Sequence, residues 1–327
     1  MEGKMKRILT FVLVLVMAFS ATVFAAGGKD NGKKRVAYIA RAQADLFAAW
    51  LANSIKDEAK KYPNLTVDVM DGQADDAKQN GLIENAIANK YDLIILQPND
   101  SEAQKPYVLK AVDAKIPVII TNPRIPDPNI MAVTNSIDSN PYDCGAFVAR
   151  YALKVVPQNA KVVVLRGPDG NIHSVQRRLA WKQEFFDKRP DVTIVAEDSG
   201  HWNKDEGMTF MEDWVQANPQ IDAICSMNDN MAMGALEAVK GNPKFANLLA
   251  FGVDGDAAAA LLIKAGTMTA TAFQNANELA KKNMELANAI LTGAQKQIVN
   301  DNIVCPLYTK DNVDELIAIH KQTGAIK

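Results

Sequence analysis

Short apolar runs alternate with longer amphipathic stretches along the chain from Arg35 onward. The runs are continuously apolar, which is typical of strands that are covered on both faces of a parallel sheet. The stretches between them carry apolar residues at helical spacing. Repeated strand–helix–strand units need right-handed crossovers, so the pattern predicts a doubly wound α/β fold. In the first part of the chain we expect strands at 36–40, 65–70, 93–97, 117–121 and 131–133, and helices at 46–61, 76–90 and 101–115.

The same pattern restarts after about residue 136, which predicts a second α/β unit of similar size. Ser101 with Gln104, and Asp76 with Gln79, indicate capping boxes at two helix starts of the first unit. In the second unit we expect strands at 161–166, 192–196, 223–226, 248–253, 268–272 and 303–307, and helices at 142–156, 174–188, 205–217, 230–240, 256–265 and 278–291.

The first 25 residues have the pattern of a secretory signal peptide. Lys4, Lys6 and Arg7 form a basic start, the run 8–20 is apolar, and the cleavage triplet 23–25 has a small residue at each end. The apolar run is too short for a comfortable membrane span. We therefore expect cleavage after residue 25 and a free periplasmic protein, with an uncleaved anchor as the alternative. No Cys follows the cleavage position, so no lipid anchor is expected.

Composition narrows the function classes. The chain has 327 residues, a length that favours two domains. Its net charge is −2, from 36 Lys and Arg against 38 Asp and Glu, so nothing electrostatic points to nucleic acid. The three cysteines, Cys144, Cys225 and Cys305, are odd in number and widely spaced, which argues against a disulfide framework or a zinc ribbon. Cys225 lies inside an apolar run and is expected to be a buried thiol.

Polar and aromatic side chains follow the predicted strands in both halves. Ligands of open α/β sheets bind outside the carboxyl ends of the strands. Amides, carboxylates and guanidinium groups pair with hydroxyls, and aromatic rings can lie on the C–H faces of a sugar. One such residue alone is more often a helix cap or a turn residue, but recurrence in both halves favours a site for a hydroxyl-rich ligand. The candidates are Arg41, Asp45, Phe47, Asn122, Asn171, His173, Arg177, Trp202, Asn228, Asp254 and Gln274.

Several of these segments resemble a known family. The pieces are the stretch from Asn228 to Gly234, Asn-Asp-Asn-Met-Ala-Met-Gly, the Phe-Gly-Val-Asp-Gly piece around Asp254, and the stretches 116–122 and 270–274. They are similar to periplasmic sugar-binding proteins of the ribose/galactose type, the substrate-binding components of ABC importers, and most of all to the glucose/galactose-binding member. The resemblance covers nearly all of the chain after the leader. It implies a type I periplasmic binding protein, with two doubly wound domains and a three-segment hinge.

The resemblance also implies roles for the candidates. Asp45 would take sugar hydroxyls, Phe47 and Trp202 would stack on the two sugar faces, and Arg177 would fork onto the ring oxygen and a hydroxyl. The remaining polar ligands at the strand ends and the hinge would be Asn122, Asn228, Asp254 and Gln274.

The chain departs from the glucose/galactose-binding member at three points. Asn171 and His173 stand where that protein has a His and an Asp, and Arg41 stands where it has an aromatic residue. These changes predict a cleft richer in donors that prefers a ligand with an extra acceptor; the alternative is that Arg41 pairs with Asp45 at the rim. The calcium loop is missing at 156–160, so we expect no metal and no cofactor.

The hinge implied by the resemblance divides the chain into discontinuous domains. We expect crossings near 134–138, 275–277 and 305–308. The first domain would then contain 34–135 plus 275–305, and the second 136–274 plus 306–327, after the signal peptide 1–25. His320, on a terminal helix without an acidic or Cys partner nearby in the sequence, is expected at the surface.

Three function classes stay open from the sequence. The leading one is a periplasmic solute receptor, expected as a monomer, which binds glucose or galactose first, then a pentose or an inositol, and serves an ABC permease. A chemoreceptor is a second candidate partner. A secreted sugar-acting enzyme could use Asp45 and Asp254 as acid and base, but GxSxG, HExxH, GxGxxG and P-loop motifs are missing. A LacI-type effector core would need a DNA-binding helix-turn-helix where the leader stands.

Overall fold

A computed structural model describes residues 32–327. The predicted signal peptide, residues 1–25, lies outside the described residues. Within 32–327, no helix combines the length and the hydrophobicity that crossing a membrane requires.

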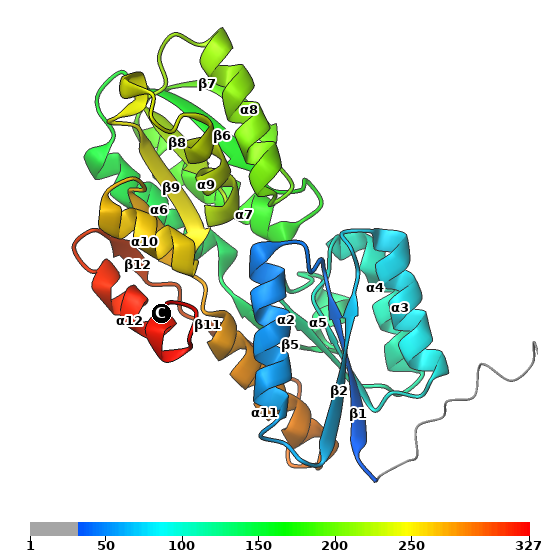
Figure 1. Cartoon of the computed structure of the whole chain (residues 1–327). Helices are drawn as coiled ribbons and strands as arrows, with labels where there is room; N and C mark the ends of the chain where they lie inside the picture. The colour runs from blue at the N-terminus through cyan, green and yellow to red at the C-terminus, as the bar shows by residue number, and fades with distance from the viewer. Residues whose placement is uncertain (1–31) are drawn as a thin grey trace, which may run out of the picture. The chain divides into compact units, whose positions relative to one another are not determined.

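The first sheet is parallel throughout, with strand order β11-β5-β4-β3-β1-β2. Its paired strands β1 and β2 are seen side by side in Figure 1. Leu51 of α2 and Met284 of α11 pack with apolar strand residues on one face, and Ile83 of α3 and Val108 of α4 pack on the other. The strands therefore lie between two helical layers, which explains their continuous apolar runs. The elements of this first lobe are β1 (Lys34–Ala40), α2 (Leu46–Ala59), β2 (Leu65–Asp71), α3 (Asp76–Ala88), β3 (Leu93–Leu96), α4 (Ser101–Asp113), β4 (Val118–Thr121), α5 (Pro128–Met131), β5 (Asn135–Ser139), α11 (Ala276–Leu291) and β11 (Asn300–Ile303).

The second sheet has the order β12-β10-β9-β8-β6-β7, parallel except for the antiparallel edge strand β12. Trp181 of α7 is fully buried and meets the ring of Phe251 on β9 edge-on, with ring centroids 5.7 Å apart. The elements of this second lobe are α6 (Pro141–Val155), β6 (Lys161–Arg166), α7 (Ile172–Glu184), the short 3-10 helices Phe186–Lys188 and Pro243–Phe245, β7 (Thr193–Ser199), α8 (Lys204–Ala217), β8 (Ala223–Ser226), α9 (Asp229–Ala238), β9 (Leu249–Asp254), α10 (Ala257–Ala265), β10 (Ala270–Phe273), β12 (Leu307–Thr309) and α12 (Val313–Gln322).

The chain passes between the two sheets three times. It crosses from β5 to α6, from β10 to α11, and from β11 to β12. The pairing of β5 with β11 runs to Ser139, so residues 136–139 lie in the first sheet although the sequence placed them in the second domain. Each crossing is only a few residues long, which leaves few positions at which the lobes can bend against each other.

Two strand predictions were wrong. The apolar stretch 131–133 ends the short helix α5, because Asp127 caps that helix and Pro128 starts it. The strand follows as β5, whose sequence Asn-Ser-Ile-Asp-Ser is polar yet buried, so an apolar pattern could not reveal it. The stretch 303–307 is split between β11 and β12 around Val304, which is 73% exposed at the third crossing.

The N-cap residues of α3 and α4 each lie one position before the N-cap that the sequence predicted. The N-cap of α4 is Asp100, whose carboxylate accepts from the backbone N–H groups of Glu102 and Ala103. The N-cap of α3 is Asp75, which accepts from the N–H of Lys78. Carboxylates are good N-caps, so the residue before each predicted cap serves the same purpose.

Cys144 and Cys305 form a disulfide, which corrects the prediction drawn from the odd cysteine count. Their Cα atoms are 5.4 Å apart although 161 positions separate them in sequence. Cys144 lies in the first turn of α6, directly after the first crossing, and Cys305 lies on the third crossing. The spacing of the cysteines along the chain did not indicate this pairing. Cys225 is a buried free thiol, as expected, and burial raises its pKa.

Candidate functional site

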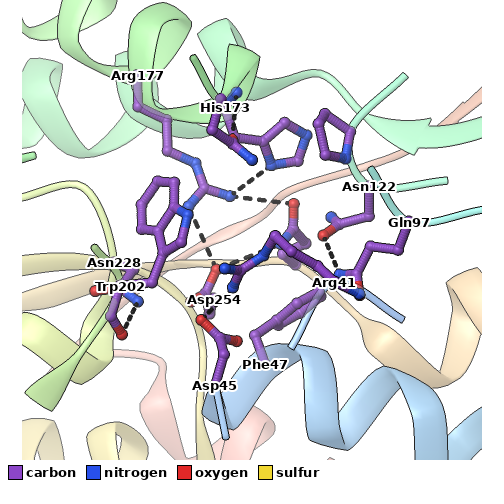
Figure 2. Close-up of a pocket in the computed structure, with 13 residues that line it drawn as sticks. Arg41, Asp45, Phe47, Gln97, Asn122, His173, Arg177, Trp202, Asn228 and Asp254 are labelled. Atoms are coloured by element: carbon purple, nitrogen blue, oxygen red, sulfur yellow. Dashed lines mark hydrogen bonds and ion pairs between the residues drawn. The ribbon is translucent and has the colours of Figure 1, made fainter. Parts of the chain in front are cut away.

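All eleven candidate residues line one pocket between the carboxyl ends of the two sheets (Figure 2). Arg41, Asp45, Phe47 and Asn122 come from the first lobe, most of the others from the second, and Gln274 follows β10 at the second crossing. The free volume between the side chains is about 30 Å³, which holds water but not a sugar ring. A ligand of that size therefore needs the lining side chains to rearrange.

Three of the candidates are also helix N-caps. Asp45 caps α2 and accepts from the N–H of Ala48 at 2.7 Å. Asn171 caps α7 and Asn228 caps α9 in the same way. These three residues therefore cap helices and also line the pocket, so the two roles do not exclude each other. Capping fixes the side chain, which presents its remaining polar atom in a defined direction.

Arg41 pairs with Asp45 inside the pocket. Its Nη2 lies 2.5 Å from Asp45 Oδ2, and both side chains are buried. Of the two orientations that the sequence left open, the structure has the pairing with Asp45, located within the pocket and not at its rim. Figure 2 shows the Arg41 side chain extending across the middle of the pocket. The pairing offsets the positive charge that Arg41 would otherwise bring to a ligand.

His173 is engaged through both ring nitrogens. Its Nε2 lies 3.0 Å from Asp138 Oδ1, and its Nδ1 lies 3.3 Å from Arg177 Nη2. Because a guanidinium can only donate, Nδ1 accepts and Nε2 carries the hydrogen that is donated to Asp138. The ring is neutral in this arrangement, and burial lowers the pKa of His173, with Asp138 opposing that effect. His173 therefore supplies no free ring donor, contrary to the donor-rich interpretation.

Asp138 lies on β5, and its carboxylate fixes the orientation of the His173 ring. Burial alone would raise the pKa of Asp138, but His173 and Arg124 outweigh it, so the pKa lies below its ordinary value. The backbone N–H of Arg124 donates to Asp138 Oδ2 at 2.9 Å. This fully buried carboxylate thus joins a residue of the first lobe to His173 of the second.

Arg177 is the centre of a buried polar network. Its Nη1 donates to the carbonyl oxygen of Met227 at 2.8 Å and lies 3.5 Å from Asp254 Oδ1, while Nη2 donates to Gln274 Oε1 at 3.2 Å. Gln274 Nε2 in turn donates to Asp254 Oδ1 at 3.3 Å. Burial raises the pKa of Asp254 well above its ordinary value, although Arg177 opposes this.

Two buried donors of the pocket have no partner among the described residues. They are Arg177 Nε and Asn122 Nδ2. A buried donor without a partner costs about 1–3 kcal/mol, so both groups favour a ligand that brings acceptors to them. Asp254 and Asp45 supply acceptors on the same pocket surface. The pocket as a whole offers donors and acceptors together, which is what vicinal hydroxyl groups require.

The two aromatic rings come from different lobes and are both buried. The Trp202 ring lies against Gly167, where a Cβ would be 2.2 Å from the ring, so this position has no room for a side chain. Arg177 Cζ lies 5.6 Å from the centre of the Trp202 ring. Phe47 meets Trp50 edge-on at 5.8 Å.

Three pocket residues have backbone conformations that side chains rarely adopt. The φ angles are 43° at Asn122, 65° at Trp202 and 121° at Asp254. Such strain costs of order 1–3 kcal/mol per residue and is concentrated at functional sites. Three of the nine non-glycine residues with a positive φ in residues 32–327 line this pocket.

Gln97 and Pro123 also line the pocket, although neither was among the predicted site residues. Gln97 is buried, donates from Nε2 to Asn122 Oδ1 at 3.3 Å, and accepts from the backbone N–H of Arg41 at 3.1 Å. It thereby orients both of these residues. Gln97 ends the predicted strand 93–97, so the strand-end rule that found the others could have found it.

The lobes touch each other beside the pocket. Asn171 Nδ2 of the second lobe donates to the carbonyl oxygen of Asn99 in the first at 3.2 Å. A Cβ built on Gly170 would lie 1.7 Å from Asp100 Oδ2, so these two segments are in tight contact. No cluster of three or more His, Cys, Asp or Glu side chains within residues 32–327 is arranged to hold a metal ion.

Similarity to known proteins identifies the family. Residues 36–295 match the model of a periplasmic binding protein domain. The chain belongs to this family of solute-binding proteins. A xylitol-binding protein of Mycolicibacterium smegmatis is 27% identical, covering 74% of this chain and 68% of the relative. A D-apiose import binding protein of Paraburkholderia graminis is 29% identical, covering 93% and 96%.

Solved structures show the same fold. An ABC transporter solute binding protein of Bacillus halodurans with bound myo-inositol superimposes with a TM-score of 0.82 at 26% identity, covering 89% of this chain and 99% of that one. The two doubly wound sheets and their three crossings are therefore the type I periplasmic binding protein fold, as the sequence predicted.

Proposed function

We propose that this protein is an extracytoplasmic solute receptor that binds a neutral monosaccharide or cyclic polyol in the pocket and delivers it to an ABC permease. The observation that carries the proposal is the pairing of charges in the pocket. Arg41 lies against Asp45, and Arg177 lies against Asp254, so the lining is close to neutral overall. A ligand with a full charge would disturb one of these buried pairs and leave a charge uncompensated.

The chemistry of the lining supports a polyol. Arg177 Nε and Asn122 Nδ2 are free to donate, and carboxylate oxygens of Asp45 and Asp254 are placed to accept. Phe47 and Trp202 offer apolar faces for ring C–H groups. The relatives named for xylitol and D-apiose, and the structure with myo-inositol, are consistent with a neutral ligand of this kind.

The compartment is part of the proposal. The leader pattern at 1–25 supports export with cleavage after residue 25. The disulfide between Cys144 and Cys305 supports an oxidising compartment, because such bonds are rare in the cytosol. We infer a periplasmic protein whose lobes, 34–139 with 276–303 and 140–275 with 304–327, close on the ligand by bending at the three short crossings.

A thermal-shift screen tests the ligand class. The panel contains monosaccharides, cyclitols and sugar acids, with galactose and galacturonate as a matched neutral and acidic pair. A ligand that binds only the native state raises the melting temperature, so we expect a rise with at least one neutral polyol and no larger rise with its acid. A rise confined to the acids would reject a neutral ligand, and no rise with any member would reject this pocket as a sugar site.

The residues are then tested with the ligand found. Asp254→Asn should weaken binding by about 1–3 kcal/mol, because it replaces a buried acceptor that meets Arg177 and Gln274. Trp214→Ala, on α8 away from the pocket-lining residues, is the control and should leave the affinity unchanged. Equal affinity of Asp254→Asn and the unmodified protein would remove Asp254 from the site.

A further inference from the structure

A second, larger cavity of about 840 Å³ lies outside the pocket described above. Its walls come from the start of α2 in the first lobe, from the start of α10 and from α12 and the chain end in the second; Figure 1 shows α10 and α12 next to each other. The walls are mainly apolar. Leu46, Trp50, Leu261 and Ile326 are among the lining residues, and Leu46 and Leu261 are large apolar side chains with exposed surface.

Two residues that line this cavity carry a buried polar atom with no partner among residues 32–327. The two atoms are Asp256 Oδ2 and His320 Nδ1, on side chains of residues only 3% and 1% exposed. The prediction that His320 lies at the surface was wrong. Asp256 occupies the N-cap position of α10, but its side chain makes no capping hydrogen bond. Its carboxylate therefore has no structural use that the fold reveals.

The hydrogen-bonding role of His320 follows from its other nitrogen. Nε2 lies 2.7 Å from the carbonyl oxygen of Gly255, which can only accept, so Nε2 carries the hydrogen. Burial lowers the pKa of His320, which keeps the ring neutral and leaves Nδ1 as a lone-pair acceptor. Asp256 and His320 thus each bring to the cavity lining an acceptor without a partner, and Asn53 and the C-terminal Lys327 line the same cavity.

An aromatic wall stands beside these acceptors. The Trp50 ring centre lies 5.5 Å from that of His320 and 6.2 Å from that of Phe273, with the Trp50 and Phe273 rings stacked. A carboxylate, a lone-pair nitrogen and an indole ring in an apolar cavity form the kind of surface that recognises an organic cation.

The charge balance around Asp256 points the same way. Burial raises the pKa of Asp256 well above its ordinary value, and the negative charges of Asp229, Asp254 and Asp45 raise it further. Arg177 faces Asp254, whereas Asp256 forms no ion pair with any described residue. Asp229 uses its oxygens for Thr271 and for the backbone N–H groups of Gly255 and Asp256. Asp256 is the member of this group whose side chain has neither an ion pair nor a hydrogen bond among residues 32–327.

We propose that this cavity is a second binding site, which takes a small primary ammonium ion with an apolar body. The ammonium group donates to Asp256 and to His320 Nδ1, and the body lies against Trp50 and the apolar walls. Since the walls come from both lobes, the bound cation also favours the arrangement in which the lobes are in contact. The site is independent of the ligand class in the first pocket.

Binding of 2-phenylethylammonium to the full mature chain tests the proposal, followed by calorimetry and tryptophan fluorescence. The neutral isostere 2-phenylethanol is the comparison ligand. We expect saturable one-to-one binding of the ammonium ion and at least tenfold weaker binding of the alcohol. Asp256→Asn should also weaken binding of the ion at least tenfold, while Asp314→Asn, an exposed acid on α12 that pairs with Lys264, should leave it unchanged.

If Asp256→Asn does not fold, the pH dependence of 2-phenylethylammonium binding to the unmodified protein tests the same contact. The ion needs an ionised Asp256, so its binding should strengthen as the pH rises and should release a proton, seen as a heat that depends on the buffer. The carboxylates of Asp229, Asp254 and Asp45 act on the titration of Asp256, and His320 and the charged C-terminal Lys327 line the same cavity. No saturable binding, equal binding of the alcohol, or full binding by Asp256→Asn would each overturn the proposal.

Discussion

Gly170 provides a direct test of lobe contact, because a single methyl group added there collides with the opposite lobe. In Gly170→Ala the new Cβ would lie 1.7 Å from Asp100 Oδ2 and 2.8 Å from its Cγ. Gly170 does not have a positive φ, so alanine fits the local backbone and the second lobe itself should fold normally. The conflict arises only when the lobes come together around a ligand.

The magnitude follows from what Asp100 must give up. Its carboxylate caps α4 by accepting from the N–H groups of Glu102 and Ala103 at 2.8 and 2.9 Å. To make room for the methyl group it must leave that position, and loss of an N-cap costs about 0.5–2 kcal/mol. This cost applies to the ligand-bound arrangement, so we expect Gly170→Ala to bind its ligand about 2- to 30-fold more weakly. Calorimetry with the ligand from the thermal-shift screen measures it.

Two further variants separate a contact effect from a general one. Gly81→Ala places a methyl group on α3 where nothing lies within 4 Å, so it should keep the affinity and add up to about 1 kcal/mol of stability. With Asp100→Ala, the nearest remaining Asp100 atom, Cβ, is 3.6 Å away, which is ordinary contact. The double variant should therefore bind like Asp100→Ala alone. Full affinity of Gly170→Ala would refute closure through this contact.

Three other predictions follow from the same structure. Replacing Cys144 and Cys305 by Ser should lower the free energy of unfolding by up to about 5 kcal/mol, since their bond closes a loop of 161 positions; denaturant titration with and without reductant checks this, and an unchanged midpoint would contradict it. The pKa of His173 is lowered in the fold, so the unfolded chain takes up a proton first as the pH falls through about 6.5. Stability should decline there, less steeply in His173→Gln, as equilibrium unfolding at a series of pH values would show. Trp202→Ala should weaken ligand binding by roughly 2 kcal/mol or more, as a buried aromatic anchor does; wild-type affinity by calorimetry would place Trp202 outside the site.

Much of the site could be predicted from the sequence because its residues obey a rule that is local along the chain. Each buried strand of a parallel sheet is visible in the sequence as an apolar run, and the residues just after it lie at the ligand-binding edge of the sheet. Asp45, Asn228 and Asp254 were found in this way. Gln97 obeys the same rule and was overlooked only because it was counted as part of its strand.

The tertiary structure decided which residues that are distant in the sequence contact each other. The bond between Cys144 and Cys305, the hydrogen bond between His173 and Asp138, and the burial of His320 against Gly255 all join residues that are far apart in the sequence. Even β5 escaped detection, because its polar side chains are buried by neighbours that the local pattern does not contain.

The sequence by itself therefore determined most of the order of strands and helices and most of the residues at the sheet edges, since both depend on periodicity over a few positions. The structure alone decided which of those residues face each other and which atoms remain free. Arg41 illustrates the difference: its place after β1 was evident, but whether its charge is available depends on Asp45 being within 2.5 Å in the folded protein. Hydrogen bonds and ion pairs act over a few ångströms, a distance that only folding establishes.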